Sequence, residues 1–197
     1  MRAPLLLSTS RLVTTLATSL LLVIASGCGS AATPVPKPPP CDEECKDGIA
    51  IKALRETTKL AFNLTLQGKA VGSHDLTTPC PLGGTARVFG TASSNALQGS
   101  TEVQLTYVLT DCGYLFKDDD ADDNYTMKLS GTMTQTGIIA VQPSATTALV
   151  MKSDPMSFAG TVYDPPLDYA AVCPVVLGQN GNTLTGKLCG RTASTEL

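Results

Sequence analysis

Hydrophobic positions follow three patterns along this chain. Residues 12–24 form an uncharged run rich in apolar side chains. Ile51, Leu54 and Thr58 then recur at helical spacing, behind acidic residues at 42–44 that favour a helix N-terminus. These features predict a helix over about 43–57, or a shorter one capped by Asp47 because Gly48 follows it. From residue 60 onward, apolar and polar side chains alternate with the two-residue period of half-buried strands.

The alternating segments predict the fold class. They cover residues 60–67, 84–91, 102–109, 125–134, 146–152, 157–163, 172–178 and 183–189. Turn-forming residues separate them at 93–95, 118–123, 142–144, 153–155, 164–166 and 180–182. Short connections and one apolar face per strand predict a mainly β protein, an antiparallel meander of about eight strands with one short N-terminal helix. Closure as a sandwich or as an open barrel stays undecided.

The first apolar run predicts an export signal over residues 1–27. Arg2 and Arg11 supply a positive start, no acidic residue precedes the run, and small residues end it. A transmembrane anchor is the alternative, but it needs about 20 apolar residues, and this run is interrupted by hydroxyl side chains.

The sequence Ala25-Ser26-Gly27-Cys28 that ends this run resembles the lipobox of bacterial lipoproteins, although leucine is more usual at the position of Ala25. The resemblance implies cleavage before Cys28, a diacylglycerol on its sulfur and a fatty acid such as palmitate on its amino group. Gly29 and Ser30 resemble the outer-membrane sorting pattern of enteric bacteria. The expected location is therefore the bacterial cell envelope, with the membrane as a partner through a lipid anchor at Cys28.

Residues 28–40 are expected to form a tether between this anchor and a domain at 41–197. The tether has five prolines in its last seven positions, and its twelve residues after Cys28 can extend over about 35 Å. From Cys28 onward the chain carries 12 basic and 17 acidic side chains, a net charge of −5. This balance argues against nucleic acid as a partner.

The seven cysteines predict three disulfides. Assigning Cys28 to the lipid leaves six, an even number, as is usual in exported proteins. In a hairpin, the numbers of two facing residues always add up to the same value. Cys80 and Cys112 are centred on residue 96, and Cys173 and Cys189 on residue 181, both at expected turns, which predicts the pairs Cys80–Cys112 and Cys173–Cys189. Cys41 and Cys45 then pair with each other, unless one of them ties the helix to the sheet. A zinc site is the rival interpretation, but the chain has a single histidine.

A second resemblance covers residues 80–137. The pattern Cys-Pro-x-Gly-Gly, then Asp-Cys, then Ser-Gly-Thr is similar to that of secreted bacterial lipoproteins of unknown function. It implies secretion and a β fold, and it implies no activity.

An aspartate-rich stretch at 118–124 is the clearest candidate for chemistry. Asp118, Asp120, Asp122 and Asn124 stand at alternate positions, as oxygen ligands do in calcium loops. The sequence departs from an EF-hand, which has glycine at the position of Asp123 and glutamate at that of Leu129. Calcium binding is one hypothesis for this stretch, and a solvated hairpin tip is the other.

Catalytic motifs are lacking in the sequence. Ser73, His74 and Asp75 have the residue types of a triad, but neighbours on an extended chain face opposite sides. A pair of carboxylates that acts as in a glycosidase is an alternative that the sequence leaves open. Against it, the chain has no tryptophan and only nine other aromatic residues on which a sugar could stack. We therefore expect no catalytic residues and a non-catalytic binding or interaction module for an envelope protein or glycan. The alternatives are a carrier of a small apolar ligand in a half-open barrel and a carboxylate-based glycan hydrolase.

Overall fold

The computed structural model describes residues 41–95, 99–140 and 146–197. These residues form one helix, α1 (Glu43–Thr65), followed by eight strands. The strands are β1 (Gly72–Pro79), β2 (Thr85–Asn95), β3 (Ser100–Phe116), β4 (Tyr125–Ala140), β5 (Ala148–Val162), β6 (Leu167–Asn180), β7 (Thr183–Leu188) and β8 (Arg191–Glu196). The predicted export signal, Cys28, the predicted tether and the predicted turn at 142–144 lie outside the described residues.

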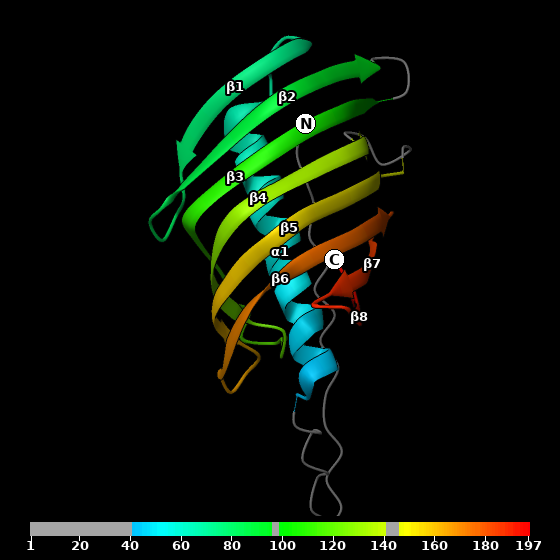
Figure 1. The fold of residues 1–197 in the computed structure, drawn as a ribbon. Coiled ribbons are helices and arrows are strands. Elements are labelled where there is room, and N and C mark those ends of the chain that lie inside the picture. Colours follow the sequence, from blue (N-terminus) through cyan, green and yellow to red (C-terminus); the bar gives the residue numbers. More distant parts are fainter. Residues whose placement is uncertain (1–40, 96–98, 141–145) are drawn as a thin grey trace, which may run out of the picture. The chain divides into compact units, whose positions relative to one another are not determined.

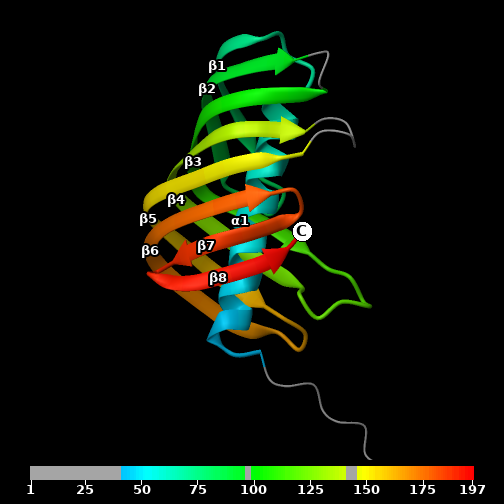
Figure 2. The ribbon, with the colours of Figure 1, turned by 90° about the vertical axis from the view of Figure 1, so that its right-hand side faces the viewer.

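All eight strands belong to one antiparallel sheet in which each strand pairs with its sequence neighbours, in the order β1 to β8. The sheet is open and strongly curved, and α1 lies across its concave side (Figures 1 and 2). The predicted antiparallel meander is therefore confirmed, as an open half-barrel around a helix. The strands of the described residues belong to one sheet and not to the two sheets of a sandwich.

Bulges bend the central strands around the helix. The register shifts between Leu109 and Cys112 in β3, between Ser130 and Met133 in β4, and between Ser153 and Met156 in β5. A bulge adds a residue to one strand and increases its local bend and twist. Because the bulges occur in three successive strand pairs, the long strands curve together, as Figure 2 shows.

The bulge in β5 also corrects one prediction. Residues 153–155 were expected to form a turn between two strands, 146–152 and 157–163. They instead stay within β5, where Asp154 and Pro155 fall in the register shift between Ser153 and Met156. A bulge tolerates a proline because its residues leave the ladder of backbone hydrogen bonds.

The helix begins where the acidic residues predicted it. Asp42 is the N-cap, and its carboxylate accepts a hydrogen bond from the backbone N–H of Cys45 at 2.9 Å. Asp47 is not the cap, since it lies inside α1 and is buried. Gly48 permits the helix to approach β8 closely, because a Cβ there would lie 3.0 Å from the Ser194 carbonyl oxygen.

The helix ends later than predicted. Residues 60–67 alternate like a strand, yet α1 continues to Thr65. Ala61 and Thr65 are buried, at helical spacing from Leu54, whereas Leu64 is 56% exposed. The Thr65 hydroxyl donates to the Ala61 carbonyl at 2.6 Å, which satisfies it inside the core. Packing against the sheet therefore outweighs the local alternation.

The hydrophobic core fills the space between α1 and the concave face of the sheet. Between the bulges, every second residue of β3 to β6 points inward, as do Met127, Leu129 and Met133 of β4. The largest fully buried side chains include Tyr107, Phe158, Ile51, Leu54, Leu105 and Leu177. The helix thus occupies the interior that an empty half-barrel would offer to a ligand.

Two strands were not predicted from the sequence. β1 and β8 are the edges of the sheet, and their segments lack a clean apolar alternation. They replace two predicted strands, because 60–67 is helical and the segments at 146–152 and 157–163 form one strand. The predicted number of eight strands is therefore correct, although the segments that form the strands are not all the predicted ones.

Candidate functional site

The three predicted disulfides are present: Cys41–Cys45, Cys80–Cys112 and Cys173–Cys189. The bridged cysteines are not facing residues of the hairpins, however. Cys80 lies in the turn between β1 and β2, and Cys189 lies in the turn between β7 and β8. Each of these two disulfides ties a turn to a neighbouring long strand, which stiffens the sheet near its edges. The Cys41–Cys45 disulfide closes the start of α1 and forms no covalent link between the helix and the sheet.

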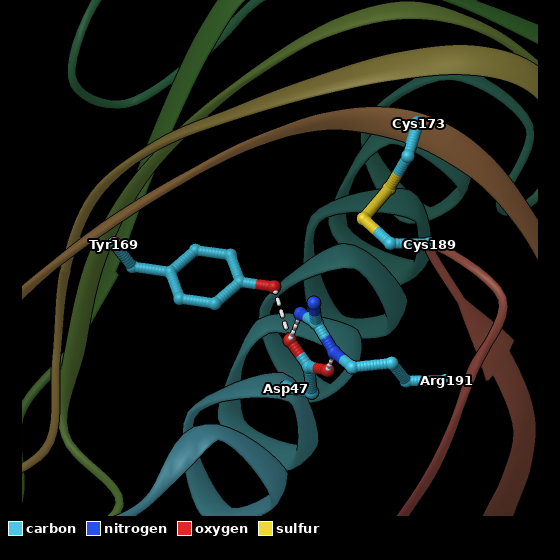
Figure 3. Close-up of a disulfide and its surroundings, with 5 residues drawn as sticks. All are labelled: Asp47, Tyr169, Cys173, Cys189 and Arg191. Carbon is cyan, nitrogen blue, oxygen red and sulfur yellow. Dashed lines mark hydrogen bonds and ion pairs between the residues drawn. A yellow bond between two sulfur atoms is a disulfide. The ribbon is translucent and has the colours of Figure 1, made fainter.

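A buried polar cluster joins α1 to β6 and β8 below the Cys173–Cys189 disulfide (Figure 3). The Asp47 carboxylate accepts a hydrogen bond from the Tyr169 hydroxyl at 2.6 Å and two from Arg191, at 2.7 and 2.8 Å. Asp47 is fully buried, whereas the Arg191 side chain is half-exposed. Burial, and then the bond to Asp47, raise the pKa of Tyr169, and Asp47 raises the pKa of Arg191. Each of the three side chains has its partner within the cluster, which makes the cluster a structural clamp between the helix and the sheet.

The aspartate-rich stretch forms the loop between β3 and β4. Asn124 folds this loop: its side-chain oxygen accepts from Asp118 N at 2.7 Å, and its amide donates to the carbonyls of Asp118 and Ala121. Asp123 pairs with Lys52 of α1, and the Asp118 carboxylate accepts from Asp120 N. Within residues 41–95, 99–140 and 146–197, no three His, Cys, Asp or Glu side chains come together as a metal group. The predicted oxygen ligands are therefore near each other in sequence but are not gathered around one point.

Ser73, His74 and Asp75 lie side by side on the edge strand β1. The His74 ring forms a hydrogen bond with the Ala70 carbonyl, with 2.8 Å between Nε2 and the oxygen. The Asp75 carboxylate accepts hydrogen bonds from Arg87, one of them at 2.7 Å from Nε. His74 and Asp75 thus have separate partners, and no relay links them.

A pocket of about 400 Å³ opens between the second half of α1 and one end of the sheet. Its helical wall includes Arg55, Glu56 and Lys59, and its strand wall includes Gln135 of β4 and Gln179 of β6. Charged and amide groups thus make up much of the lining, although Phe62 and Ile139 add apolar surface. The size is that of a small-molecule site.

Arg55 is the most unusual residue of this pocket, because only 7% of its surface is exposed. Its Nε donates to the Gln179 side-chain oxygen, and the Gln179 amide in turn donates to the Gly181 carbonyl at 2.7 Å. Burial lowers the pKa of Arg55, while Glu56 acts to raise it. Arginine nevertheless stays protonated at neutral pH, so a positive charge is held inside the protein.

A second buried pair lies beside this arginine. The Tyr107 hydroxyl donates to the Gln135 side-chain oxygen at 2.6 Å, and both residues are almost fully buried. Burial raises the pKa of Tyr107, and the positive charge of Arg55 opposes that shift. The tyrosine therefore stays neutral and serves as a hydrogen-bond donor that orients Gln135.

The carboxylates do not form a glycosidase pair in these sites. Glu56 is the one carboxylate side chain among the described residues that line this pocket, and it pairs with Lys59 at 3.3 Å. A shallower depression near the start of α1 includes Glu43 and Asp168, but both side chains are exposed. A general acid of glycoside hydrolysis is instead desolvated in an apolar setting.

Three residues of this pocket, Arg55, Gln135 and Gln179, were not predicted from the sequence. The sequence does mark these three residues, since each is a polar residue at a position where the hydrophobic periodicity predicts an apolar one. Gln135 and Gln179 continue the inward-facing positions of β4 and β6, and Arg55 follows Leu54 on the buried side of α1. Buried polar residues of this kind are informative because burial is costly for them.

No helix in the described part of the chain is both long enough and apolar enough to cross a membrane. Comparison of the chain with protein-family models, with curated proteins and with solved structures found no match.

Proposed function

We propose that this protein is a lipoprotein of the bacterial cell envelope, anchored through Cys28, whose domain at 41–197 is a non-catalytic binding module. The export signal and the lipobox-like sequence support the anchor. The three disulfides support an oxidising compartment, and they account for every cysteine except Cys28. The partner is an envelope protein, a glycan or a small molecule, and the protein meets the outer membrane through its lipid.

The observation that carries the binding role is the filled interior of the half-barrel. Helix α1 packs its buried side chains, such as Ile51 and Leu54, against the concave face where a carrier would hold an apolar ligand. The pocket that remains beside Arg55 combines charged and amide side chains with apolar ones such as Phe62 and Ile139. This lining favours recognition of a polar group over storage of an apolar molecule.

The anchor is tested by the variant Cys28→Ala in the native host. We expect the wild type to carry acyl label and to sediment with membranes, and the variant to lose both properties. Ser26→Ala is the matched control, since it keeps a small residue in the lipobox and leaves Cys28 intact. Acyl label on the Cys28→Ala protein, or a wild-type protein cut elsewhere with a free amino group, would refute the anchor.

The binding role is tested on the membrane-extracted full chain. We expect affinity capture followed by mass spectrometry of proteins and lipids to recover a partner, and turnover assays on peptidoglycan, glycan, ester and peptide substrates to remain silent. Turnover that is lost in Glu56→Gln without a change in melting temperature would replace this proposal with the hydrolase alternative.

A further inference from the structure

The positive charge of Arg55 has no anionic partner among the described residues. The ion pairs of these residues involve other side chains, and the one hydrogen bond that Arg55 donates goes to the neutral amide of Gln179. Buried charges are normally paired, because desolvation of an ion costs several kcal/mol that only an opposite charge and good hydrogen bonds offset. Arg55 therefore forms no direct ion pair within the described part of the chain, although Glu56, which is paired with Lys59, acts on its charge through space.

The surroundings of Arg55 are built to receive a small polar ligand. Among the described side chains of the pocket wall, Arg55 and Lys59 are positive and Glu56 is negative, so their net charge is +1. Because Gln179 occupies Nε, the two terminal nitrogens of the guanidinium are left without a protein partner in the described structure. A guanidinium edge of this type matches the two oxygens of a carboxylate.

The amides around Arg55 add specificity to its charge. The Gln135 oxygen accepts from Tyr107 and the Gln179 oxygen accepts from Arg55, which fixes the orientation of both side chains. The Gln135 amide nitrogen makes no hydrogen bond within the described part of the chain and belongs to the pocket wall. Gln135 thus brings a donor of fixed orientation to the same pocket as the guanidinium, and Phe62 and Ile139 of this pocket offer an apolar contact.

We propose that the pocket between the second half of α1 and the ends of β4 and β6 binds a small carboxylate ligand through Arg55 and Gln135. The inference rests on the proposed binding function and names its ligand class. A single net positive charge matches a monoanion, whereas a phosphate dianion would call for a second unpaired cation, and Lys59 is paired with Glu56. The volume of about 400 Å³ accepts a molecule the size of an acylated amino acid.

The test uses N-acetyl-leucine as the probe, with calorimetric titration of the detergent-extracted full chain. Its neutral analogue, N-acetyl-leucinamide, has the same shape without the carboxylate, and inorganic phosphate is the competing anion. We expect the acid to bind, and the amide and phosphate to bind at least about tenfold more weakly, a difference of about 1.4 kcal/mol. Absence of binding of the acid up to about 10 mM, or equal binding of the amide, would refute the carboxylate site.

Variants separate a ligand site from a merely structural arginine. Arg55→Met keeps most of the apolar stem of the side chain and removes its charge, so we expect binding to fall at least tenfold. The melting temperature should change little, because relief of the buried charge offsets the lost hydrogen bond to Gln179. The affinity of Arg55→Lys should lie between those of the wild type and Arg55→Met, because lysine keeps the positive charge but cannot donate two parallel hydrogen bonds to a carboxylate. Arg87→Met is the matched control, since Arg87 is an exposed arginine on β2 that is paired with Asp75. Wild-type affinity in Arg55→Met would overturn the proposal.

Hydrogen exchange on the wild-type protein keeps the proposal testable if Arg55→Met does not fold. We expect N-acetyl-leucine to protect residues 55–67 of the helical region and 179–182 at the β6–β7 turn, and N-acetyl-leucinamide to leave them unchanged. Protection confined to other segments would refute the site. Membrane sedimentation and turnover of the same preparation report on the proposed function separately, so the two inferences can fail independently.

Discussion

The Asp47 carboxylate of α1 accepts a hydrogen bond at 2.7 Å from Nε of Arg191, the first residue of β8. The two residues are 144 positions apart, so the contact joins the first half of the helix to the last strand. The bond lies between a fully buried acid and a half-exposed base, with Tyr169 of β6 as a third member. It fixes the edge of the open sheet against the helix that the sheet surrounds.

Replacement of Asp47 should therefore destabilise the domain strongly. Asp47→Ala leaves the buried Tyr169 hydroxyl and the Arg191 guanidinium without their acceptor, and we expect a loss of about 2–4 kcal/mol in the free energy of unfolding. Asp47→Asn should lose less, because its amide oxygen still accepts from Tyr169. Denaturant unfolding measures both variants. Asp75→Ala in the exposed pair with Arg87 is the control and should change little; an equal loss there would contradict this role of Asp47.

Tyr125 and Tyr107 should respond oppositely to loss of their hydroxyls. The Tyr125 hydroxyl is buried and has no hydrogen-bond partner among the described residues, whereas that of Tyr107 donates to Gln135. We expect Tyr125→Phe to be neutral or to stabilise the protein by up to about 1 kcal/mol, and Tyr107→Phe to destabilise it by about 1 kcal/mol. Thermal unfolding of the two variants side by side checks this, and the reverse order would show that the Tyr125 hydroxyl has a partner.

The same tyrosines predict alkaline sensitivity. Burial raises the pKa of Tyr107, Tyr125 and Tyr169 above the ordinary tyrosine value of 10.0. The folded protein thus holds these protons more tightly than the unfolded chain. Their contribution to stability is complete below pH 10 and is lost as the pH rises through the folded-state pKa values. Urea unfolding from pH 8 to 12 should show a decline that begins near pH 10 and is shallower in Tyr125→Phe; a flat profile would contradict it.

The disulfides should rank by the length of chain that they close. The separations are 32 residues for Cys80–Cys112, 16 for Cys173–Cys189 and 4 for Cys41–Cys45. Loop-closure entropy gives about 3.7, 3.1 and 1.9 kcal/mol in that order. Paired Cys→Ser variants, unfolded under identical oxidising conditions, measure the three contributions. A largest loss at Cys41–Cys45 would mean that this bridge has a role beyond the start of α1.

Calcium should not stabilise the loop at 118–124. The Asn124 side chain is occupied by backbone groups of the loop, and Asp123 by Lys52. We expect the melting temperature to stay constant between EDTA and millimolar calcium. A rise with calcium that Asp120→Asn abolishes would restore the calcium hypothesis, because ligand binding to the folded state must raise its stability.

The sequence by itself determined those features that depend on near neighbours along the chain. Asp42 and the acidic residues after it predicted the start of α1, and the apolar alternation predicted the long strands at the centre of the sheet, apart from the bulge that joins two predicted strands into β5. Hairpin symmetry also predicted the disulfide pairs, although two of the cysteines lie in turns beside the strands. Strands that pair in chain order keep such partners close, so local rules are sufficient.

Only the tertiary structure decided the features that depend on distant contacts. Residues 60–65 follow a strand period, but Ala61 and Thr65 are helical because the helix packs across the whole sheet. The edge strands β1 and β8 are held by pairing with their neighbours, and β8 also by the Asp47 cluster, since their own patterns are weak. The Arg55 pocket combines side chains that lie 124 positions apart in the chain, Arg55 and Gln179. The two side chains meet and become buried only when the curved sheet surrounds the helix. Burial is what makes an unpaired polar group costly, so the properties of this pocket depend on the tertiary structure.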